Sequence, residues 1–500
     1  MKTHSTVSRR DFMKVLGIGA AGVGAMAASA PVFHDLDELN SSGSDNPASY
    51  AGGAKFPWWV KKRPHYDPTT EVDWDLKERL DYRHDGLAYT PETEDLAVKT
   101  RIRLIYEYMS TNVPGHSIKD AAFSSASGTS AGSPPLAGNT WRGFNTSGRI
   151  LSDFVVNDRT ITPTMASRGM TREILGLPAK HEGTPEDNLN MIRRVSSFFG
   201  VPIAGALEMT PQLRKMPYRS LGTINPPVAR QIVWDEELGE TVTQPYQTDT
   251  HTVLPRSLRW VLVGQIPHSG IHRHGTTLLA NGGPLSYADA WLYEQRMSTF
   301  IAGLGYNQAC GPFVSNPGMG ILAGLGELGR HDYLVSPLLG SNVRYSIYIF
   351  TDLPLAPTPP IDAGIWRFCH TCKKCAETCP GEAISHESKP TWEKSGPWTG
   401  LGNNSWHHKY DLCMPWRGQP GGNLPGSCQV CMGACVFTKK PNASIHEIIK
   451  ATQATTGAFN GFFRVMDDFF GYGEKVGPES FWDMNKIASH PWNGYGACIQ

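Results

Sequence analysis

The sequence lacks a charge excess of either sign. Its 500 residues contain 46 Lys and Arg against 46 Asp and Glu, so the formal net charge is zero. Proteins that bind nucleic acid or anionic membrane surfaces usually carry a basic patch that a positive charge balance reveals. The balance therefore gives no indication of either partner.

The sequence also lacks an apolar run as long as the roughly 20 residues that a membrane-spanning helix needs. The longest candidate, Val15 to Ala30, is rich in glycine and alanine and ends in a small-residue cleavage pattern, Ala28-Ser29-Ala30. It follows the paired arginines Arg9 and Arg10. These features predict a twin-arginine signal peptide over residues 1–30, although a stable N-terminal anchor is the alternative.

What the sequence does contain is a concentration of cysteine. Eight of its ten cysteines lie between residues 369 and 435. A disulfide framework is typical of small secreted domains, whereas tight groups of cysteine in a long chain indicate metal or redox chemistry. The cysteine pattern therefore predicts a metal or redox centre in the C-terminal part of the chain.

The first cysteine motif has the spacing of bacterial ferredoxins. Cys369, Cys372, Cys375 and Cys379, followed by Pro380, give C-x2-C-x2-C-x3-C-P. In that arrangement three thiolates on one tight loop bind one iron–sulfur cluster, and the fourth binds a second cluster. A structural zinc site is less consistent with this run, because zinc ligands usually come as separated pairs.

A second motif supplies the remaining thiols. Its spacing is C-x14-C-x2-C-x3-C, with a longer first gap than in ferredoxins and with Val436 where proline is usual. By the crossover rule each cluster takes one cysteine from the other motif. One 4Fe–4S cluster is then expected on Cys369, Cys372, Cys375 and Cys435, and the other on Cys379, Cys413, Cys428 and Cys431. Two such clusters in series deliver electrons, so another part of the chain must use them.

Before the cysteines, the hydrophobic pattern alternates strands with helices. Residues 258–263 and 345–350 are apolar runs typical of buried strands. One helix should begin after Thr184 as its cap, with Pro185 in the first turn, and another should span residues 286–304. The alternation predicts an α/β core followed by a small, loop-rich iron–sulfur unit.

These features together resemble the reductive dehalogenases. The resemblance rests on the leader, on the stretched second cysteine motif, and on the phrases Gly324 to Arg330, Thr351 to Leu355 and Pro360 to Asp362. It implies an α/β (α+β) fold with a nitroreductase-like, corrinoid-binding core and a C-terminal ferredoxin-like domain with two clusters. The expected divisions are a signal peptide at 1–30, an N-terminal region at 31–165, the corrinoid-binding core at 166–360, the two-cluster domain at 361–441 and a C-terminal segment at 442–500.

The resemblance implies an enzyme that removes halogen from a chlorinated ethene, alkane or aromatic as the terminal reductase of organohalide respiration. Two 4Fe–4S clusters would feed a cobalamin-type corrinoid that has no protein ligand below cobalt. The sequence agrees with the last point, because it lacks D-x-H-x-x-G, the motif that supplies such a ligand in many corrinoid proteins.

The reaction needs a proton as well as two electrons. In the family a tyrosine donates it, helped by a basic residue and, in some members, by an asparagine. Matched by position, the resemblance implies Tyr287 as the acid, Arg344 as the cation and Asn316 as the amide. A nearby cation lowers the pKa of a tyrosine. Tyr293 is a competing acid, and ordinary packing, surface or turn roles are open for all of these residues.

The glycine motif Gly324-x-Gly326-x-x-Gly329 matches the dinucleotide-binding fingerprint. Its flanking residues fit poorly with the strand, tight turn and helix that this fingerprint requires. A close approach of the backbone to another large cofactor and a tight interior turn are the two other interpretations.

Two other functions are compatible with paired clusters. Epoxyqueuosine reductase shares the corrinoid and the clusters, but it acts on tRNA in the cytoplasm, which the leader and the neutral charge disfavour. A ferredoxin-like electron-transfer subunit with a large docking domain is the second alternative. As partners the resemblance implies a small organohalide, a small membrane-anchor protein and an upstream donor of a respiratory chain, with no nucleic acid. The expected location is peripheral, on the outer face of the cytoplasmic membrane.

Overall fold

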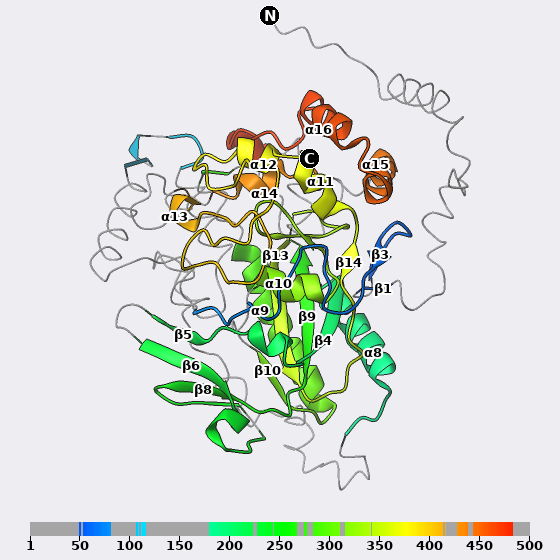
Figure 1. Cartoon of the computed structure of the whole chain (residues 1–500), viewed down its shortest axis with the longest axis vertical. Helices are drawn as coiled ribbons and strands as arrows, with labels where there is room; N and C mark the ends of the chain where they lie inside the picture. Colours follow the sequence, from blue (N-terminus) through cyan, green and yellow to red (C-terminus); the bar gives the residue numbers. More distant parts are fainter. Residues whose placement is uncertain are drawn as a thin grey trace, which may run out of the picture. The chain divides into compact units, whose positions relative to one another are not determined.

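The fold was analysed in a computed structural model (Figure 1). The structure describes residues 50–51, 54–81, 107–108, 110–111, 113–116, 180–223, 228–243, 245–267, 275–277, 284–310, 316–341, 343–413, 416, 428–438 and 444–483. The predicted signal peptide, residues 1–30, lies outside these residues, as does most of the predicted N-terminal region, 31–165.

A four-stranded antiparallel sheet forms the centre of the fold. Its strands are β4 (Ile203–Glu208), β9 (Trp260–Pro267), β10 (Gln308–Cys310) and β13 (Val343–Thr351). They are ordered β10-β13-β9-β4. The architecture is therefore mixed α/β as predicted, with neighbouring strands that run in opposite directions.

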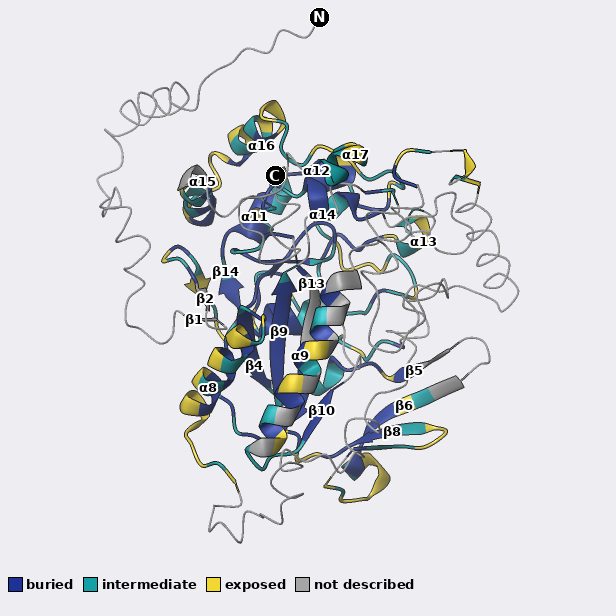
Figure 2. Ribbon diagram, turned by 180° about the vertical axis from the view of Figure 1, so that it is seen from behind, coloured by how far each residue is buried: buried dark blue, intermediate teal, exposed yellow. Residues whose placement is uncertain are grey.

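Helices cover both faces of this sheet. On one face, α8 (Pro185–Phe198) and α9 (Pro284–Gly303) bury Ile192 and Met297 against Leu262 and Ile266 of β9. In Figure 2, α9 lies in front of the sheet and α8 lies beside β4. On the other face, α10 (Asn316–Leu322) packs Met319 into a second core that contains the odd-numbered valines of β9. Because successive side chains of a strand alternate between faces, one apolar strand supplies both cores.

The helix predicted to begin after Thr184 is confirmed. The Thr184 hydroxyl accepts a hydrogen bond from the Asp187 N–H at 3.1 Å, and Pro185 is the first helical residue. The predicted helix at 286–304 is α9, which begins two residues earlier, at Pro284. The predicted strand at 258–263 is β9, which is shifted toward the C-terminus.

The segment between β4 and β9 forms a second, smaller sheet. It contains β5 (Ser220–Thr223), β6 (Val228–Trp234), β7 (Tyr246–Gln247) and β8 (His251–Leu254), in the order β5-β6-β8-β7. Only the β6–β8 pair is parallel among these strands. The buried carboxylate of Asp235, in the short helix η4 (Asp235–Leu238), accepts hydrogen bonds from the main-chain N–H groups of Val242 and Arg256 and so fixes the loops around this sheet.

The eight cysteines between residues 369 and 435 lie in or next to short helices at one end of the central sheet (Figure 1). These helices are α11 (Ile365–Thr371), α12 (Lys374–Glu377), α13 (Tyr410–Cys413) and α14 (Val430–Ala434). Two small ribbons connect them to the core, β11 (Glu327–Leu328) with β12 (Leu334–Val335), and β3 (Lys61–Lys62) with β14 (Ile361–Asp362). The remaining described strands are β1 (Tyr50–Ala51) and β2 (Ala54–Lys55).

Three further helices follow the cysteines, α15 (Ser444–Thr455), α16 (Asn460–Phe469) and α17 (Glu479–Trp482). Helix α16 exposes an apolar stripe of Phe462, Val465 and Phe469, spaced at helical intervals. Across the part of the chain that is described, no helix combines the length and the apolar character that crossing a membrane requires.

Gly324 lies very close to the main chain of a neighbouring segment. Its φ is +76°, and a β-carbon there would lie 2.2 Å from the Pro359 carbonyl oxygen. Gly200 has a φ of +90° with open space around the same position. A substitution at Gly200 therefore tests backbone strain alone, whereas one at Gly324 tests strain and steric overlap together.

We expect Gly200→Ala to lower the free energy of unfolding by about 1–2 kcal/mol, the cost of a left-handed alanine. Gly324→Ala should lower it by about 1–3 kcal/mol more, because the added methyl group overlaps the carbonyl oxygen. Denaturant unfolding of both variants beside the wild-type protein measures the difference. Equal losses in the two variants would show that residues 324 and 359 separate at little cost.

Candidate functional site

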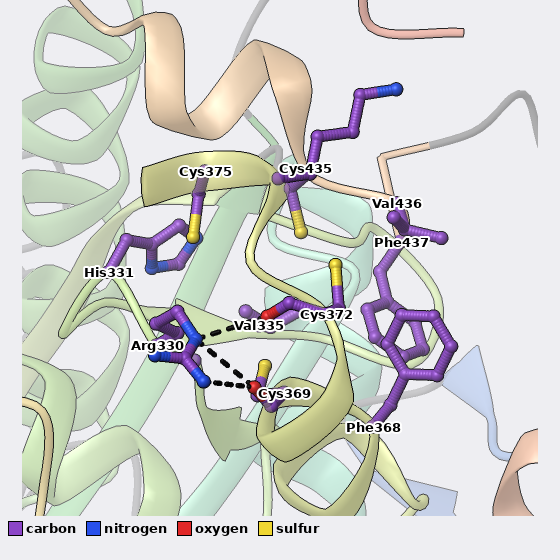
Figure 3. A pocket seen from close by; sticks show the side chains of 12 residues that line it. Arg330, His331, Val335, Phe368, Cys369, Cys372, Cys375, Cys435, Val436 and Phe437 are labelled. Carbon is purple, nitrogen blue, oxygen red and sulfur yellow. Dashed lines mark hydrogen bonds between the residues drawn. The ribbon is translucent and has the colours of Figure 1, made fainter. Parts of the chain in front are cut away.

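Four cysteines meet in one small cavity. Cys369 lies in α11, Cys372 ends that helix in an extended conformation, and Cys375 lies in α12. Cys435 follows α14. All four line the same cavity, and Figure 3 shows their sulfur atoms turned toward a common space. The turn between two short helices thus places three thiols of the first motif around one point, and the second motif supplies the fourth.

The other four cysteines form a second group. Cys379 follows α12, Cys413 ends α13, and Cys428 and Cys431 lie at the start of α14. Burial raises the pKa of Cys431, and the nearby thiols of Cys428, Cys413 and Cys379 raise it further. Cys413 therefore comes back to the motif despite the long sequence gap that separates it from Cys428.

The two groups are neighbours, because α12 packs against α14. Burial raises the pKa of Cys375, and so do the three other thiols of its own group and Cys431 of the second group. Cys379 and Cys431 also pack against the buried cluster around Cys375. This grouping is the one that the crossover spacing requires, and the role of the thiols as ligands stays a prediction.

The thiol groups fit an iron–sulfur cluster better than a single ion. In the described residues, no three His, Cys, Asp or Glu side chains converge closely enough to hold one metal ion. A zinc ion would require sulfur atoms at about 2.3 Å from the metal. Four thiols spaced around a shared cavity instead suit a cluster that presents several iron atoms. Burial raises the pKa of Cys372 to about 12, which disfavours a free thiolate at this position.

Arg330 holds the first cysteine loop from inside the protein. Its side chain is 1% exposed. Its guanidinium donates to the carbonyl oxygens of Cys369 at 2.8 Å and Cys372 at 3.0 Å. It also donates to those of Ser385 at 2.8 Å and Glu387 at 2.7 Å. A planar group with five N–H donors can reach several carbonyls at once. One side chain therefore joins two segments, residues 369–372 and residues 385–387, to the core.

Glu327 holds the start of the helix that carries Cys369. Its buried carboxylate accepts hydrogen bonds from the N–H groups of Ala363 at 2.7 Å, Ile365 at 3.0 Å and Trp366 at 3.2 Å. These N–H groups lie at the N-terminus of α11, where an acceptor is otherwise missing and negative charge is favoured. Burial raises the pKa of Glu327, and the hydrogen bonds from the chain offset part of that rise.

Glu327 lies within the glycine motif, and Arg330 follows it directly. The motif follows α10 and contains β11, so it does not have the strand, turn and helix of a dinucleotide site. Gly324 approaches the Pro359 carbonyl, and a β-carbon at Gly326 would lie 2.4 Å from the Val335 carbonyl oxygen. The tight-turn interpretation therefore fits the structure. The two charged residues in this turn were not identified as site residues from the sequence.

Lys374 ties the cysteine helices to the C-terminal helices. Its ammonium group is buried and lies 2.5 Å from the Asp467 carboxylate and 3.0 Å from that of Asp468, both on α16. Arg464 of α16 pairs in turn with Glu377 at the end of α12. Because Lys374 stands directly before Cys375, these ion pairs fix the position of α12.

A neutral histidine lines the first cavity. His331 is buried, its Nδ1 accepts from the Tyr333 N–H, and its Nε2 lies 2.9 Å from the Ser341 hydroxyl. The proton is thereby placed on Nε2, which donates to Ser341. Burial lowers the pKa of His331 to about 4, so the ring adds no charge to the cavity near neutral pH.

The predicted proton-transfer residues lie on three elements of the core. Tyr287 is in the first turn of α9, Asn316 is the first residue of α10, and Arg344 lies where the pairing of β13 with β9 is irregular. Their side chains lie outside the described part of the structure.

The main-chain positions of Tyr287 and Arg344 lie at the same end of the sheet. The Ser286 hydroxyl donates to the Pro267 carbonyl oxygen at 3.4 Å, and Pro267 is the register partner of Val343. This end faces the first cysteine group, because a β-carbon at Gly340 would lie 2.2 Å from the carbonyl oxygen of Phe437, which lines the cysteine cavity.

Tyr293, the competing acid, is a core residue. Its side chain is 1% exposed, and its hydroxyl lies 2.8 Å from the Ser196 hydroxyl of α8. Burial raises the pKa of this tyrosine far above its ordinary value. A packing role between α8 and α9 accounts for this side chain.

Two curated proteins match nearly the whole chain. It is 32% identical to a trichloroethene reductive dehalogenase of Dehalococcoides mccartyi, over 95% of this chain and 96% of that protein. It is 30% identical to a chloroethene reductive dehalogenase of another strain of that species, over 96% and 97%. A tetrachloroethene reductive dehalogenase of Sulfurospirillum multivorans is 30% identical over 48% of each chain. No family model matches the chain.

Solved structures match the fold. A catabolic reductive dehalogenase superposes with a TM-score of 0.54 and 20% identity, over 85% of this chain and 50% of that chain. A reductive dehalogenase described in connection with B12-dependent dehalogenation gives a TM-score of 0.51 and 18% identity, over 83% and 49%. This chain thus spans about half the length of these two solved proteins.

We expect Arg330→Lys to weaken the first cysteine group selectively. An ammonium group cannot replace a fork that reaches four carbonyls, so the loop of Cys369 and Cys372 should loosen. If each cysteine group holds one 4Fe–4S cluster, the iron content should fall from about eight to about four per chain. Iron analysis and electron paramagnetic resonance of anaerobically purified protein would measure this loss.

Arg367→Lys is the matched control, because Arg367 lies on α11 beside Cys369, is partly exposed and donates to the Ala454 carbonyl oxygen. This variant should keep the iron content and the paramagnetic resonance spectrum of the wild-type protein. Two intact clusters in Arg330→Lys would show that the cysteine loop holds its shape without the guanidinium.

Proposed function

This chain belongs to the reductive dehalogenase family, and from that premise we propose that it removes chlorine reductively from a chlorinated ethene. Family membership makes it an oxidoreductase. The observation that carries the substrate proposal is the match over nearly the full length to relatives named for trichloroethene and chloroethene. The small apolar substrate would be converted with two electrons and one proton, and chloride would leave.

We propose that the two cysteine groups hold two 4Fe–4S clusters in series. When bound, the clusters supply single-electron transfer between a donor and the reaction centre. The support is chemical: each group offers four thiols, and Cys375 and Cys431 lie at the border between the groups. Arg330, Glu327 and Lys374 keep this border fixed, because each binds the main chain or an acid next to the cysteine helices.

We propose that a corrinoid without a protein ligand below cobalt binds at the end of the sheet that faces the first cysteine group. When bound, a corrinoid in the cobalt(I) state supplies the reducing electrons that cleave the carbon–halogen bond. One feature of the structure fits such a group. Gln265 of β9 is 1% exposed, and neither polar atom of its amide has a hydrogen-bond partner among the described residues. A nitroreductase-like core and a ferredoxin-like two-cluster domain belong to the same proposal.

Within this proposal Tyr287 donates the proton to the carbon that loses the halogen. Arg344 would stabilise the tyrosinate that remains, and Asn316 would orient the substrate or the tyrosine. The proximity of the main chain of Tyr287 to that of Arg344, through Pro267 and Val343, supports the first two roles.

The proposal extends to the cellular setting. We infer that the leader directs export by the twin-arginine route, and that the enzyme works on the outer face of the cytoplasmic membrane. A small membrane protein would anchor it there, and an upstream donor of a respiratory chain would reduce the second cluster. The enzyme would thereby act as the terminal reductase of organohalide respiration.

Anaerobic purification of the protein after expression with corrinoid available tests the proposal directly. We expect about eight iron atoms and one cobalt atom per chain, which is the content of two 4Fe–4S clusters and one corrinoid. With a reduced viologen as donor, the protein should release chloride from trichloroethene. Eight iron atoms with no cobalt and no chloride release would leave only an electron-transfer protein.

Tyr287→Phe tests the proton donor. Because a positioned general acid contributes about 10²–10⁴-fold, we expect kcat for dechlorination to fall within that range while the iron and cobalt contents stay unchanged. Tyr293→Phe is the control: it removes a hydroxyl that contacts Ser196, so it should cost about 1 kcal/mol of stability and leave kcat nearly intact. If the two variants exchanged these effects, Tyr293 would be the acid.

A further inference from the structure

A buried amide in the central sheet has no visible partner. Gln265 stands near the C-terminal end of β9, between its register partners Ile203 of β4 and Ser346 of β13. It is 1% exposed, and both its Oε1 and its Nε2 lack a hydrogen-bond partner among the described residues. A native protein rarely buries an amide in this way, because the lost hydrogen bonds to water are not replaced.

The side chain points to the face of the sheet that α10 covers. Val261 and Val263, which alternate with it along β9, belong to the core on that face, whereas Leu262 and Ile266 belong to the core under α8 and α9. Apolar side chains would suffice for packing at this position, as they do at the neighbouring odd-numbered positions of β9. A glutamine there therefore indicates that its amide hydrogen-bonds a polar partner.

Its position limits what that group can be. Gln265 is two residues from Pro267, at the end of the sheet where Ser286, Val343 and the first cysteine group come together. A chlorinated ethene offers no strong hydrogen-bond donor or acceptor, so it cannot satisfy the amide. A corrin ring carries carboxamide side chains, each with a carbonyl and an NH2 group, which match the acceptor and the donors of a glutamine.

We propose that Gln265 hydrogen-bonds a carboxamide side chain of the bound corrinoid and orients the ring against the end of the sheet. This inference rests on the proposed function. A neutral amide suits the task, because it binds a neutral partner without burying a charge. The site is also rigid, since β9 is paired on one side with β4 and on the other with β13.

The test is Gln265→Met, which keeps the length of the side chain and removes its amide. The protein is prepared with its iron–sulfur clusters and without corrinoid, and cobalamin is then titrated into it while the absorption spectrum is followed. We expect about tenfold or greater weakening of cobalamin binding, because a buried donor and acceptor on the ring lose their partner. Without cobalamin, the midpoint of thermal unfolding should stay the same or rise, because an unsatisfied amide has been removed.

Asn188→Leu is the matched control. The NH2 group of this buried amide donates to the carbonyl oxygens of Gly183 and Pro354, whereas its Oδ1 has no partner among the described residues. It lies on α8, which covers the opposite face of the sheet. Its removal should lower the midpoint of thermal unfolding and leave the affinity of the folded protein for cobalamin unchanged.

The outcomes are distinguishable. If the wild-type protein binds no cobalamin, the proposed function fails and takes the inference with it. If the wild-type protein binds cobalamin and Gln265→Met binds it equally well, the inference alone is overturned. A fall in the midpoint of Gln265→Met without cobalamin, as large as that of Asn188→Leu, would also overturn it, because the amide would then have a partner in the protein itself.

Discussion

The guanidinium of Arg330 is buried between the core and the cysteine helices, and it donates to the main chain on both sides of the first cysteine loop. Its face also lies 4.1 Å from the centre of the Trp406 ring. Burial lowers the pKa of Arg330, and the nearby thiols of Cys369, Cys375 and Cys372 oppose that shift. A charge buried in this way is costly unless its donors are satisfied, and here the loop carbonyls satisfy them. The loop and the cation therefore depend on each other.

The same turn carries the opposite charge three residues earlier. Glu327 binds the N-terminus of α11, while Arg330 binds the carbonyls at the C-terminal end of that helix, so the two side chains hold both ends of the segment with Cys369. Gly324 and Gly326 allow the turn to lie against the neighbouring main chain. The motif that resembles a dinucleotide fingerprint thus has a structural explanation: it joins the sheet to the first cysteine group and fixes their relative position.

Local patterns were predictable from the sequence, and long-range contacts were not. The Thr184 cap depends on residues within one turn, and the first cysteine motif on residues within one loop, so spacing alone indicated both. The position of Cys413 in the second group was predicted by the crossover rule, which describes a tertiary contact known from other proteins. The roles of Arg330 and Glu327 could not be predicted, because their partners lie about 35 to 60 residues further along the chain. The signal available from the sequence was a glutamate and an arginine beside three closely spaced glycines.

The charges around the first cysteine group bear on how the proposed clusters would differ. Lys374 is neutralised by Asp467 and Asp468, and His331 is uncharged, whereas the partners shown for Arg330 are carbonyl oxygens. Reduction adds negative charge to a cluster, and a nearby cation stabilises the reduced form more than the oxidised form. Arg330 would therefore raise the potential of the first cluster relative to the same cluster without it. Among the thiols, those of Cys369, Cys375 and Cys372 act on Arg330, and all three belong to the first group. If the two groups hold the proposed clusters, the cation would therefore favour electron flow from the second cluster to the first.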